Sequence, residues 1–312
     1  MTSLEIAQRS KVRESAASNA RALELIEKAK VPTLPAVAVR TAQLASDPEA
    51  KTAEIVSLVS SDPSLTARVL KLVNSAYYAV PRGVSDVRRA VSYLGLDTLH
   101  QLVLTVAVVR ALPRLRDGSP LDAGRLWQHA LATALLARDI GRRQRLPVEE
   151  LFTGGLLHDI GKIISACADP EGFARACDDA RERDISLFDA ERARDGRGPR
   201  ADHEQVGRVA ARRWRLPPRL VACIGFHHAA SGRGAVSLIG DQRTAALVVG
   251  AADYIARYAG FGDGCSTNVG EPSEGLLEEV RVRGGELDLL AARLPNELAR
   301  WKSFLELLHD PA

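Results

Sequence analysis

Apolar residues recur at intervals of three and four along most of this 312-residue chain, and that spacing constrains the fold more than any other feature. In "SLTARVLKLVNSAYY", for example, Leu65, Val69 and Leu72 fall on one stripe of a helix. Asp62 followed by Pro63 marks the start of that helix, because the aspartate can cap it and proline suits its first position. No alternating run is long enough to predict a strand, and aromatic residues are only 4% of the chain. The sequence therefore predicts an all-α fold with an aliphatic core.

The segment "PRLRDGSPLD", at 113–122, is the best internal boundary because it combines two prolines, a glycine and mixed charges. We expect a helical N-terminal bundle over 1–112, a second helical unit over 122–260, and a flexible loop with C-terminal helices over 261–312. In the second unit the apolar spacing predicts helices over 122–144, 147–166, 170–184, 202–214, 217–228 and 239–259.

Charge, hydropathy and cysteine spacing bear on the compartment and on the kinds of partner that this chain has. The net charge of +3 is spread along the chain, and so modest an excess does not by itself argue for a nucleic-acid partner, which we do not expect. Residues 1–30 are too charged for a signal peptide, and Leu99–Val109 is too short for a membrane span, so we expect a cytoplasmic protein with no membrane partner. The cysteines lack CxxC spacing and are predicted to be free, buried thiols: Cys167, Cys177, Cys223 and Cys265.

A histidine and an aspartate stand side by side in the apolar run "GGLLHDIGK", at His158 and Asp159. Burying such groups is costly unless they are paired or bind something. Residues three and four apart share a helix face, so a helix through this run places Lys162 on the same face as His158. The run therefore predicts a buried polar site that needs further partners.

Candidate partners lie elsewhere in the second half of the chain. Taken singly, a histidine on an apolar helix is more often a hydrogen-bonded core residue than a ligand, and Asp253 can be a cap or a paired core acid. Taken together, imidazoles and carboxylates suit Fe, Mn, Co, Ni or Zn, and a carboxylate between two such ions holds them close enough to share a hydroxide. We therefore predict a site for two divalent metal ions with these ligands: His129, His158, Asp159, His203, His227, His228 and Asp253.

Small residues accompany several of these ligands. Gly161 follows His158 by three positions, and Gly250 precedes Asp253 by three. Such residues leave room for metal and substrate between helices, and they serve close helix packing equally well.

Several spaced motifs resemble a known family. The order of the candidate ligands is similar to the metal-binding pattern of the HD superfamily of phosphohydrolases, and "GLLHDIGK" is close to the form found in bacterial HD-type phosphodiesterases. Over roughly residues 25–260, the chain resembles the HDOD domain in the segments "LPAVAVRTAQLASDP", "SDPSLTARVLKLVNSAYY", "AVSYLGLDTLHQLVL" and "HEQVGRVAARRWRLPPRLVACIGFHH".

The resemblance implies a helical N-terminal bundle packed on an HD-like helical core, and a role in bacterial signal transduction. The candidate ligands match metal-binding positions of the HD superfamily, with one or both of His227 and His228 included, and Lys162 matches the lysine that follows the HD pair in the phosphodiesterases. Two features depart from the pattern. The segment "AASGRGAV" after His228 lacks the glutamate and the GYP of the cyclic-di-GMP phosphodiesterases, and Arg125 stands where sites with a third metal carry a carboxylate.

Two functions follow as hypotheses. The first is a stand-alone HDOD regulatory protein whose metal site supports binding of a signalling protein or a nucleotide-like ligand. The second is an active metal-dependent phosphohydrolase on a nucleotide or cyclic nucleotide, in which Asp159 and Lys162 are the catalytic residues. Nucleic-acid binding is a third and weaker reading, since it rests only on the excess of arginine.

Overall fold

The computed structural model describes residues 3–45, 51–74, 78, 80, 83–193, 200–228, 238–266, 268–270, 272, 275–301 and 304–306. These residues form α-helices and connections and contain no strand, which confirms the all-α prediction. The helices of the first part are α1 (Ser3–Lys28), α2 (Ala36–Ala45), α3 (Thr52–Ser60), α4 (Pro63–Val73), α5 (Val87–Leu94) and α6 (Leu96–Ala111).

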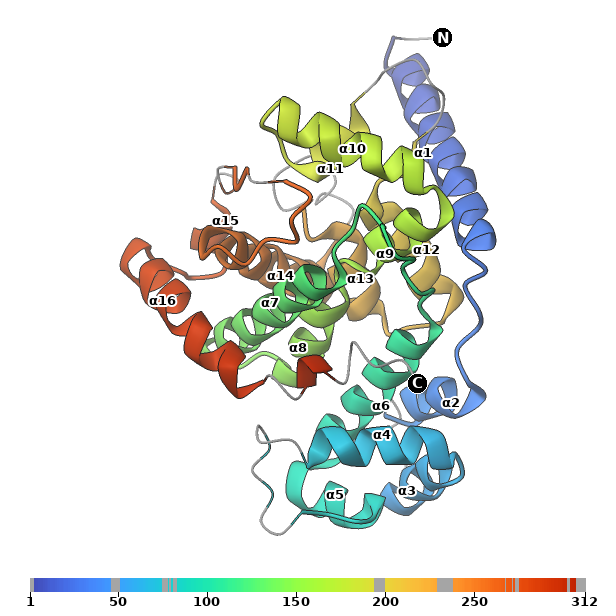
Figure 1. Ribbon diagram of the computed structural model, residues 1–312, viewed down its shortest axis with the longest axis vertical. Coiled ribbons are helices and arrows are strands. Elements are labelled where there is room, and N and C mark those ends of the chain that lie inside the picture. The colour runs from blue at the N-terminus through green and yellow to red at the C-terminus, as the bar shows by residue number, and fades with distance from the viewer. Residues whose placement is uncertain are drawn as a thin grey trace.

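The central and last parts of the chain continue this pattern. The central helices are α7 (Ala123–Arg143), α8 (Val148–Leu157), α9 (Ile160–Ala168), α10 (Pro170–Glu182), α11 (Leu187–Arg192), α12 (His203–Arg213), α13 (Pro218–Phe226) and α14 (Gly240–Tyr258). Two more follow, namely α15 (Leu276–Glu279) and α16 (Gly284–Arg300). In Figure 1, α3, α4 and α5 form the lower end of the molecule, while α7, α8, α13 and α14 lie at its centre.

Aspartate side chains start many of these helices. Each accepts a hydrogen bond from the backbone N–H three residues further on, which satisfies one of the free donors of the first turn. Two of the caps, before α4 and α10, are followed directly by proline at the first helical position. The capping residues are Asp62, Asp86, Asp122, Asp169 and Asp202.

The core is aliphatic, as the low aromatic content predicts. Leu131 of α7, Leu156 of α8 and Val248 of α14 lie in one buried cluster. A second cluster joins α1 to α12 through Ile26 and Trp214, and the Trp214 Nε1–H donates a 2.8 Å hydrogen bond to the Pro32 carbonyl. The first helix therefore packs on the second half of the chain, beside α9 and α12.

The predicted helix over 147–166 is wrong in one respect, because it breaks at the His–Asp pair. His158 keeps helical angles, but Asp159 has φ −98° and ψ 13°, and α9 begins at the next residue. In one continuous helix, adjacent side chains point about 100° apart. The break allows both His158 and Asp159 to face the same centre.

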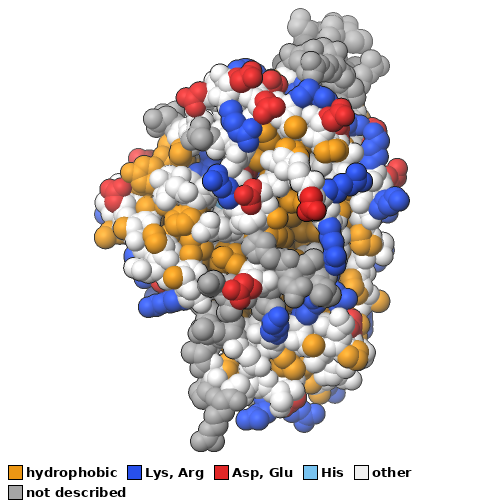
Figure 2. Space-filling view, viewed as in Figure 1, with side chains coloured by type: hydrophobic (Ala, Val, Ile, Leu, Met, Phe, Trp, Pro, Cys, Tyr) orange, Lys and Arg blue, Asp and Glu red, His pale blue; other side chains and the backbone are white. Residues whose placement is uncertain are grey.

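All four cysteines are free, as predicted. Three of them are buried, and Cys167 is half-buried. Within the described residues, no helix is both long and apolar enough to cross a membrane. On the face shown in Figure 2, Lys and Arg side chains are interspersed with acidic and apolar ones. Asp263 and Cys265, in the segment predicted to be a flexible loop, are buried.

Candidate metal centre

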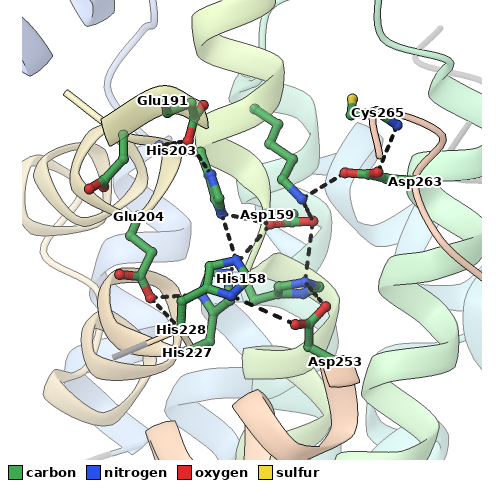
Figure 3. A network of polar contacts seen from close by, with 12 residues as sticks. His158, Asp159, Glu191, His203, Glu204, His227, His228, Asp253, Asp263 and Cys265 are labelled. Carbon is green, nitrogen blue, oxygen red and sulfur yellow. Dashed lines mark hydrogen bonds and ion pairs between the residues drawn. The ribbon is translucent and has the colours of Figure 1, made fainter. Parts of the chain in front are cut away.

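All seven predicted ligands converge in the middle of the helical core. His129 comes from α7, His158 and Asp159 from the junction of α8 and α9, and His203 from the first residue of α12. The two remaining histidines directly follow α13, and Asp253 lies within α14. Figure 3 shows the six labelled members of this set pointing toward one another: His158, Asp159, His203, His227, His228 and Asp253. Six of the seven are almost completely buried, and His228 has the most exposed side chain, at 16%.

The carboxylate of Asp159 lies between two groups of histidines. Its Oδ2 is 3.3 Å from Nε2 of His158 and 3.6 Å from Nε2 of His129. Its Oδ1 is 3.6 Å from Nε2 of both His203 and His227. Among the described residues, two groups place metal-binding atoms within 4.8 Å of one another, namely His129, His158 and Asp159 on one side, and His203, His227 and His228 on the other. The carboxylate of Asp159 thus lies between two groups of side chains that could each hold a metal ion.

The ring orientations of the histidines are fixed by their other nitrogen. The Nδ1 of His129 lies 2.7 Å from the Phe261 carbonyl oxygen, and the Nδ1 of His158 lies 2.7 Å from that of Gly155. The Nδ1 of His227 lies 3.2 Å from the Cys223 carbonyl oxygen. An Nδ1–H held in this way leaves Nε2 as a lone-pair donor toward the centre, which is the usual arrangement of metal-binding histidines.

Two buried atoms of the centre lack a hydrogen bond. Asp159 Oδ1 and His227 Nε2 are both enclosed and have no hydrogen-bond partner, although buried polar atoms are normally satisfied. The Nε2 atoms of His129 and His158 approach to 3.3 Å, and those of His203 and His228 to 3.1 Å. Nitrogens that share a metal at about 2.1 Å each lie about 3 Å apart. The residues present therefore fit divalent metal ions, and the imidazole and carboxylate donors suit the transition metals and zinc.

Asp253 is a buried, charged partner of His129. Its Oδ1 lies 3.1 Å from Nε2 of His129, and Arg257 holds both of its oxygens at 3.2 and 2.8 Å. Burial acts to raise the pKa of Asp253, but the Arg257 guanidinium and His129 hold it well below its usual range. Asp253 is therefore an anion at neutral pH.

Lys162 is buried and is held between two carboxylates. Its Nζ donates hydrogen bonds of 2.6 Å to Asp159 Oδ2 and 2.7 Å to Asp263 Oδ2. Burial acts to lower the pKa of Lys162, but these two carboxylates raise it well above its usual value. Burial likewise acts to raise the pKa of Asp159, and His158 and Lys162 keep it well below its ordinary value. The Lys162 ammonium therefore offsets part of the negative charge of Asp159 and Asp263 and donates a hydrogen bond to each of them.

Three acids support the ligands and were not identified from the sequence. Glu191 Oε2 lies 2.6 Å from Nδ1 of His203; burial acts to lower the pKa of that histidine, but Glu191 raises it to about 9. Glu204 Oε1 accepts a 2.6 Å hydrogen bond from the His228 backbone N–H, and burial raises the Glu204 pKa to about 7. Asp263 is the third.

The small residues beside the ligands serve close packing. A Cβ added to Gly161 would meet the backbone carbonyl of His203, and one added to Gly250 would meet that of His227. Both glycines therefore allow a backbone segment that carries a ligand to approach its neighbour. Of the two explanations open from the sequence, helix packing accounts for these positions.

Comparison with known proteins places the chain in a family. The HDOD domain family model matches residues 31–230. The chain therefore belongs to the HDOD domain family. An uncharacterised protein of Treponema pallidum (strain Nichols) is 28% identical over 200 residues, which are 64% of this chain and 37% of that protein. The chain thus corresponds to much less than the full length of this relative.

Solved structures share the fold. An HDOD domain protein of unknown function from Geobacter sulfurreducens has 27% identity and a TM-score of 0.69, with 93% of this chain and 98% of that one covered. A candidate phosphohydrolase from Shewanella amazonensis SB2B has 25% identity and a TM-score of 0.59, with 87% and 98% covered. The segment after His228, which lacks the GYP sequence, lies outside the described residues.

Proposed function

We propose that this HDOD protein is a regulatory, signal-transducing protein whose two-metal centre supports the binding of a signalling protein or a nucleotide-like ligand. The HDOD resemblance of the first half supports regulation, and the convergence of all seven predicted ligands supports metal binding. The observation that carries the choice between regulation and catalysis is the position of Lys162. Lys162 is 6% exposed, and two of the three N–H donors of its ammonium are bound by Asp159 and Asp263, so most of its hydrogen-bonding capacity is used within the protein rather than offered to a phosphate.

In this proposal two groups of side chains, one on either side of the Asp159 carboxylate, would hold the metal ions. His129 and His158 present Nε2 on one side, and His203, His227 and His228 lie on the other. Asp253 adds a carboxylate next to His129. When bound, the ions would supply Lewis acidity to a phosphate or carboxylate of the ligand. The chain's own contribution is to fix the rings through Nδ1 and to keep the centre dry.

An active phosphohydrolase is the second candidate, and one observation favours it. Every metal-binding position of the HD pattern is intact here, and Asp159 Oδ1 has no partner other than the ions it would bind. In that case Asp159 and Lys162 are the catalytic residues, with Lys162 released from Asp263 when an anionic substrate enters. The Shewanella amazonensis protein whose fold this chain shares is named as a candidate phosphohydrolase.

One comparison separates the two functions. Metal-loaded wild-type protein is incubated with bis(4-nitrophenyl) phosphate and a panel of nucleotides and cyclic nucleotides, beside Asp159→Asn. Bound metal with no turnover on any substrate supports the regulatory proposal. Turnover that disappears in Asp159→Asn, but not in the surface variant Asp117→Asn, would replace it with the phosphohydrolase.

A further inference from the structure

A polar cavity that contains none of the candidate metal ligands lies where the first half of the chain meets the second half. Its volume is about 680 Å³, and it is lined by Asp97 and His100 at the start of α6 together with the first turns of α8, α13 and α14. Ligand pockets in proteins span roughly 300–1,000 Å³. Figure 1 shows α6 beside α8, with which it packs. The cavity is therefore large enough for a small organic molecule.

Two side chains of the cavity have buried polar atoms without a partner. His100 is 5% exposed, and its Nε2 has no hydrogen bond. The neighbouring Gln101 buries an Oε1 that is equally unpartnered. Leaving such groups unsatisfied costs roughly 1–3 kcal/mol each, so they indicate a ligand or a bound solvent molecule. Burial lowers the pKa of His100 to about 4, so the ring adds no positive charge at neutral pH.

The charge of the cavity is negative. The Arg219 guanidinium is already held by Glu150 and by Asp241, the latter at 2.8 Å. The side chains that line the cavity include one arginine and four acids, namely Asp97, Glu149, Glu150 and Asp241. Burial raises the pKa of Glu149, and the more distant charges of Arg138 and Arg142 act to lower it. The starts of α6, α8, α13 and α14 each contribute a partial positive charge of about 0.5, about +2 together, which is smaller in magnitude than the −3 of the four acids and one arginine. The cavity thus has an excess of acceptors over donors.

The shape of the cavity excludes a bare metal ion as its occupant. His100, Asp97 and Glu149 do not bring their ligand atoms within 4.8 Å of one another, in contrast to the two groups at the metal centre. A larger group with several donors suits this wider spacing better than a single ion does. Apolar surface is also available for a hydrocarbon stem, from Leu146, Pro147, Pro217 and Pro218.

We propose that this cavity binds a small organic cation with a guanidinium or ammonium head on an alkyl stem. The head would donate to Asp97, Glu149 and Gln101 Oε1, and the stem would lie on the proline wall. A guanidinium suits this role because it offers five N–H donors and no acceptor.

The position of the cavity links the two halves of the protein. Glu150 of α8 and Arg219 of α13 each precede a metal-binding histidine by eight residues, a distance of about 12 Å along a helix. A cation bound here would contact α6 and the starts of the helices whose other ends carry His158 and His227. The site is separate from the metal centre, and its ligand is a different chemical class.

Binding of butylguanidinium and of its neutral isostere butylurea to the full chain tests the proposal by calorimetry at constant ionic strength. We expect saturable binding of butylguanidinium and binding of butylurea at least about tenfold weaker, because charge-assisted hydrogen bonds are the stronger ones. The double variant Asp97→Asn/Glu149→Gln should weaken butylguanidinium binding by about tenfold or more, while the exposed control Asp117→Asn should leave it unchanged.

If the double variant does not fold, the single variant Asp97→Asn still tests the proposal. Asp97 is exposed, so its replacement should not disturb folding. It should weaken butylguanidinium binding severalfold with an unchanged circular dichroism spectrum. Equal affinity for the two probes, no saturable binding of butylguanidinium, or wild-type affinity in the Asp97 variant would overturn the proposal.

Discussion

Glu191 holds His203 through two hydrogen bonds: its Oε2 lies 2.6 Å from the ring Nδ1 and accepts a 3.0 Å hydrogen bond from the backbone N–H of the same residue. One carboxylate thus fixes both the start of α12 and the direction in which the imidazole presents Nε2. Acids that orient metal-binding histidines in this way contribute strongly to metal affinity.

We predict that Glu191→Ala lowers metal affinity by about 10- to 100-fold, since the ring loses its orientation and its basicity. Glu191→Gln should retain part of the affinity, because its amide oxygen can still accept from Nδ1–H. Competition with a chromogenic chelator measures both, with Glu182→Ala on the exposed end of α10 as the control. An affinity in Glu191→Ala equal to that of the control contradicts the prediction.

Lys162 is expected to stabilise the fold through Asp263 as well as Asp159. Lys162→Met leaves two buried carboxylates without their cation, which should lower the free energy of unfolding by about 3–5 kcal/mol. Adding Asp263→Asn to that variant should restore part of the loss, because one of the uncompensated charges is removed. Urea denaturation of the four proteins of this double-mutant cycle measures the coupling. Strictly additive effects would show that the two residues do not interact.

Gly161 and Gly285 should respond to alanine in opposite directions. In Gly161→Ala the new Cβ meets the His203 backbone, so unfolding should become easier by about 1–3 kcal/mol. Gly285, in the first turn of α16, has no atom within 4 Å of the added Cβ. Its replacement should be neutral or should stabilise the helix by about 0.5–1 kcal/mol. Thermal unfolding of both variants is the measurement, and equal destabilisation would refute the packing explanation.

His100 is expected to make the fold less stable at acid pH. Its pKa falls to about 4 in the folded chain because of burial, against an ordinary value of 6.5. Between these values the unfolded chain binds the proton more readily, so the stability contribution is complete above pH 6.5 and is lost as the pH falls toward 4. The loss is about 3 kcal/mol. In His100→Gln the decline between pH 7 and pH 4, followed by urea denaturation, should be smaller by that amount; identical declines would contradict the assignment.

Sequence patterns predicted most of the helices and the seven histidine and aspartate side chains that converge on the candidate metal centre. Asp62, Asp122 and Asp202 carry a capping signal that is local, so the starts of α4, α7 and α12 could be read directly. The ligands were recognisable because histidine and aspartate are unusual in apolar helices. The break in the helix at His158 and Asp159 could not be recognised from the sequence, because no proline stands there and both flanking segments are apolar.

The supporting acids could not be predicted because their partners are distant in the chain. Asp263 reaches Lys162 from 101 residues away, and Glu191 lies on α11, a helix of six residues whose sequence resembles a charged surface segment. The sequence contains one weak indication that Asp263 has a structural role: it stands between Gly262 and Gly264, in the segment that the sequence predicts to be a flexible loop. Such residues are brought to the centre only by the folding of distant segments against one another.

Metal content tests the central claim most directly. Wild-type protein and Asp159→Asn are loaded with Mn, Fe or Zn, dialysed, and analysed by plasma mass spectrometry, with circular dichroism to confirm folding. The two groups of ligands around Asp159 predict about two ions per wild-type chain and a clear loss in the variant. No stably bound metal in the folded wild-type protein, or equal content in Asp159→Asn, would contradict the account.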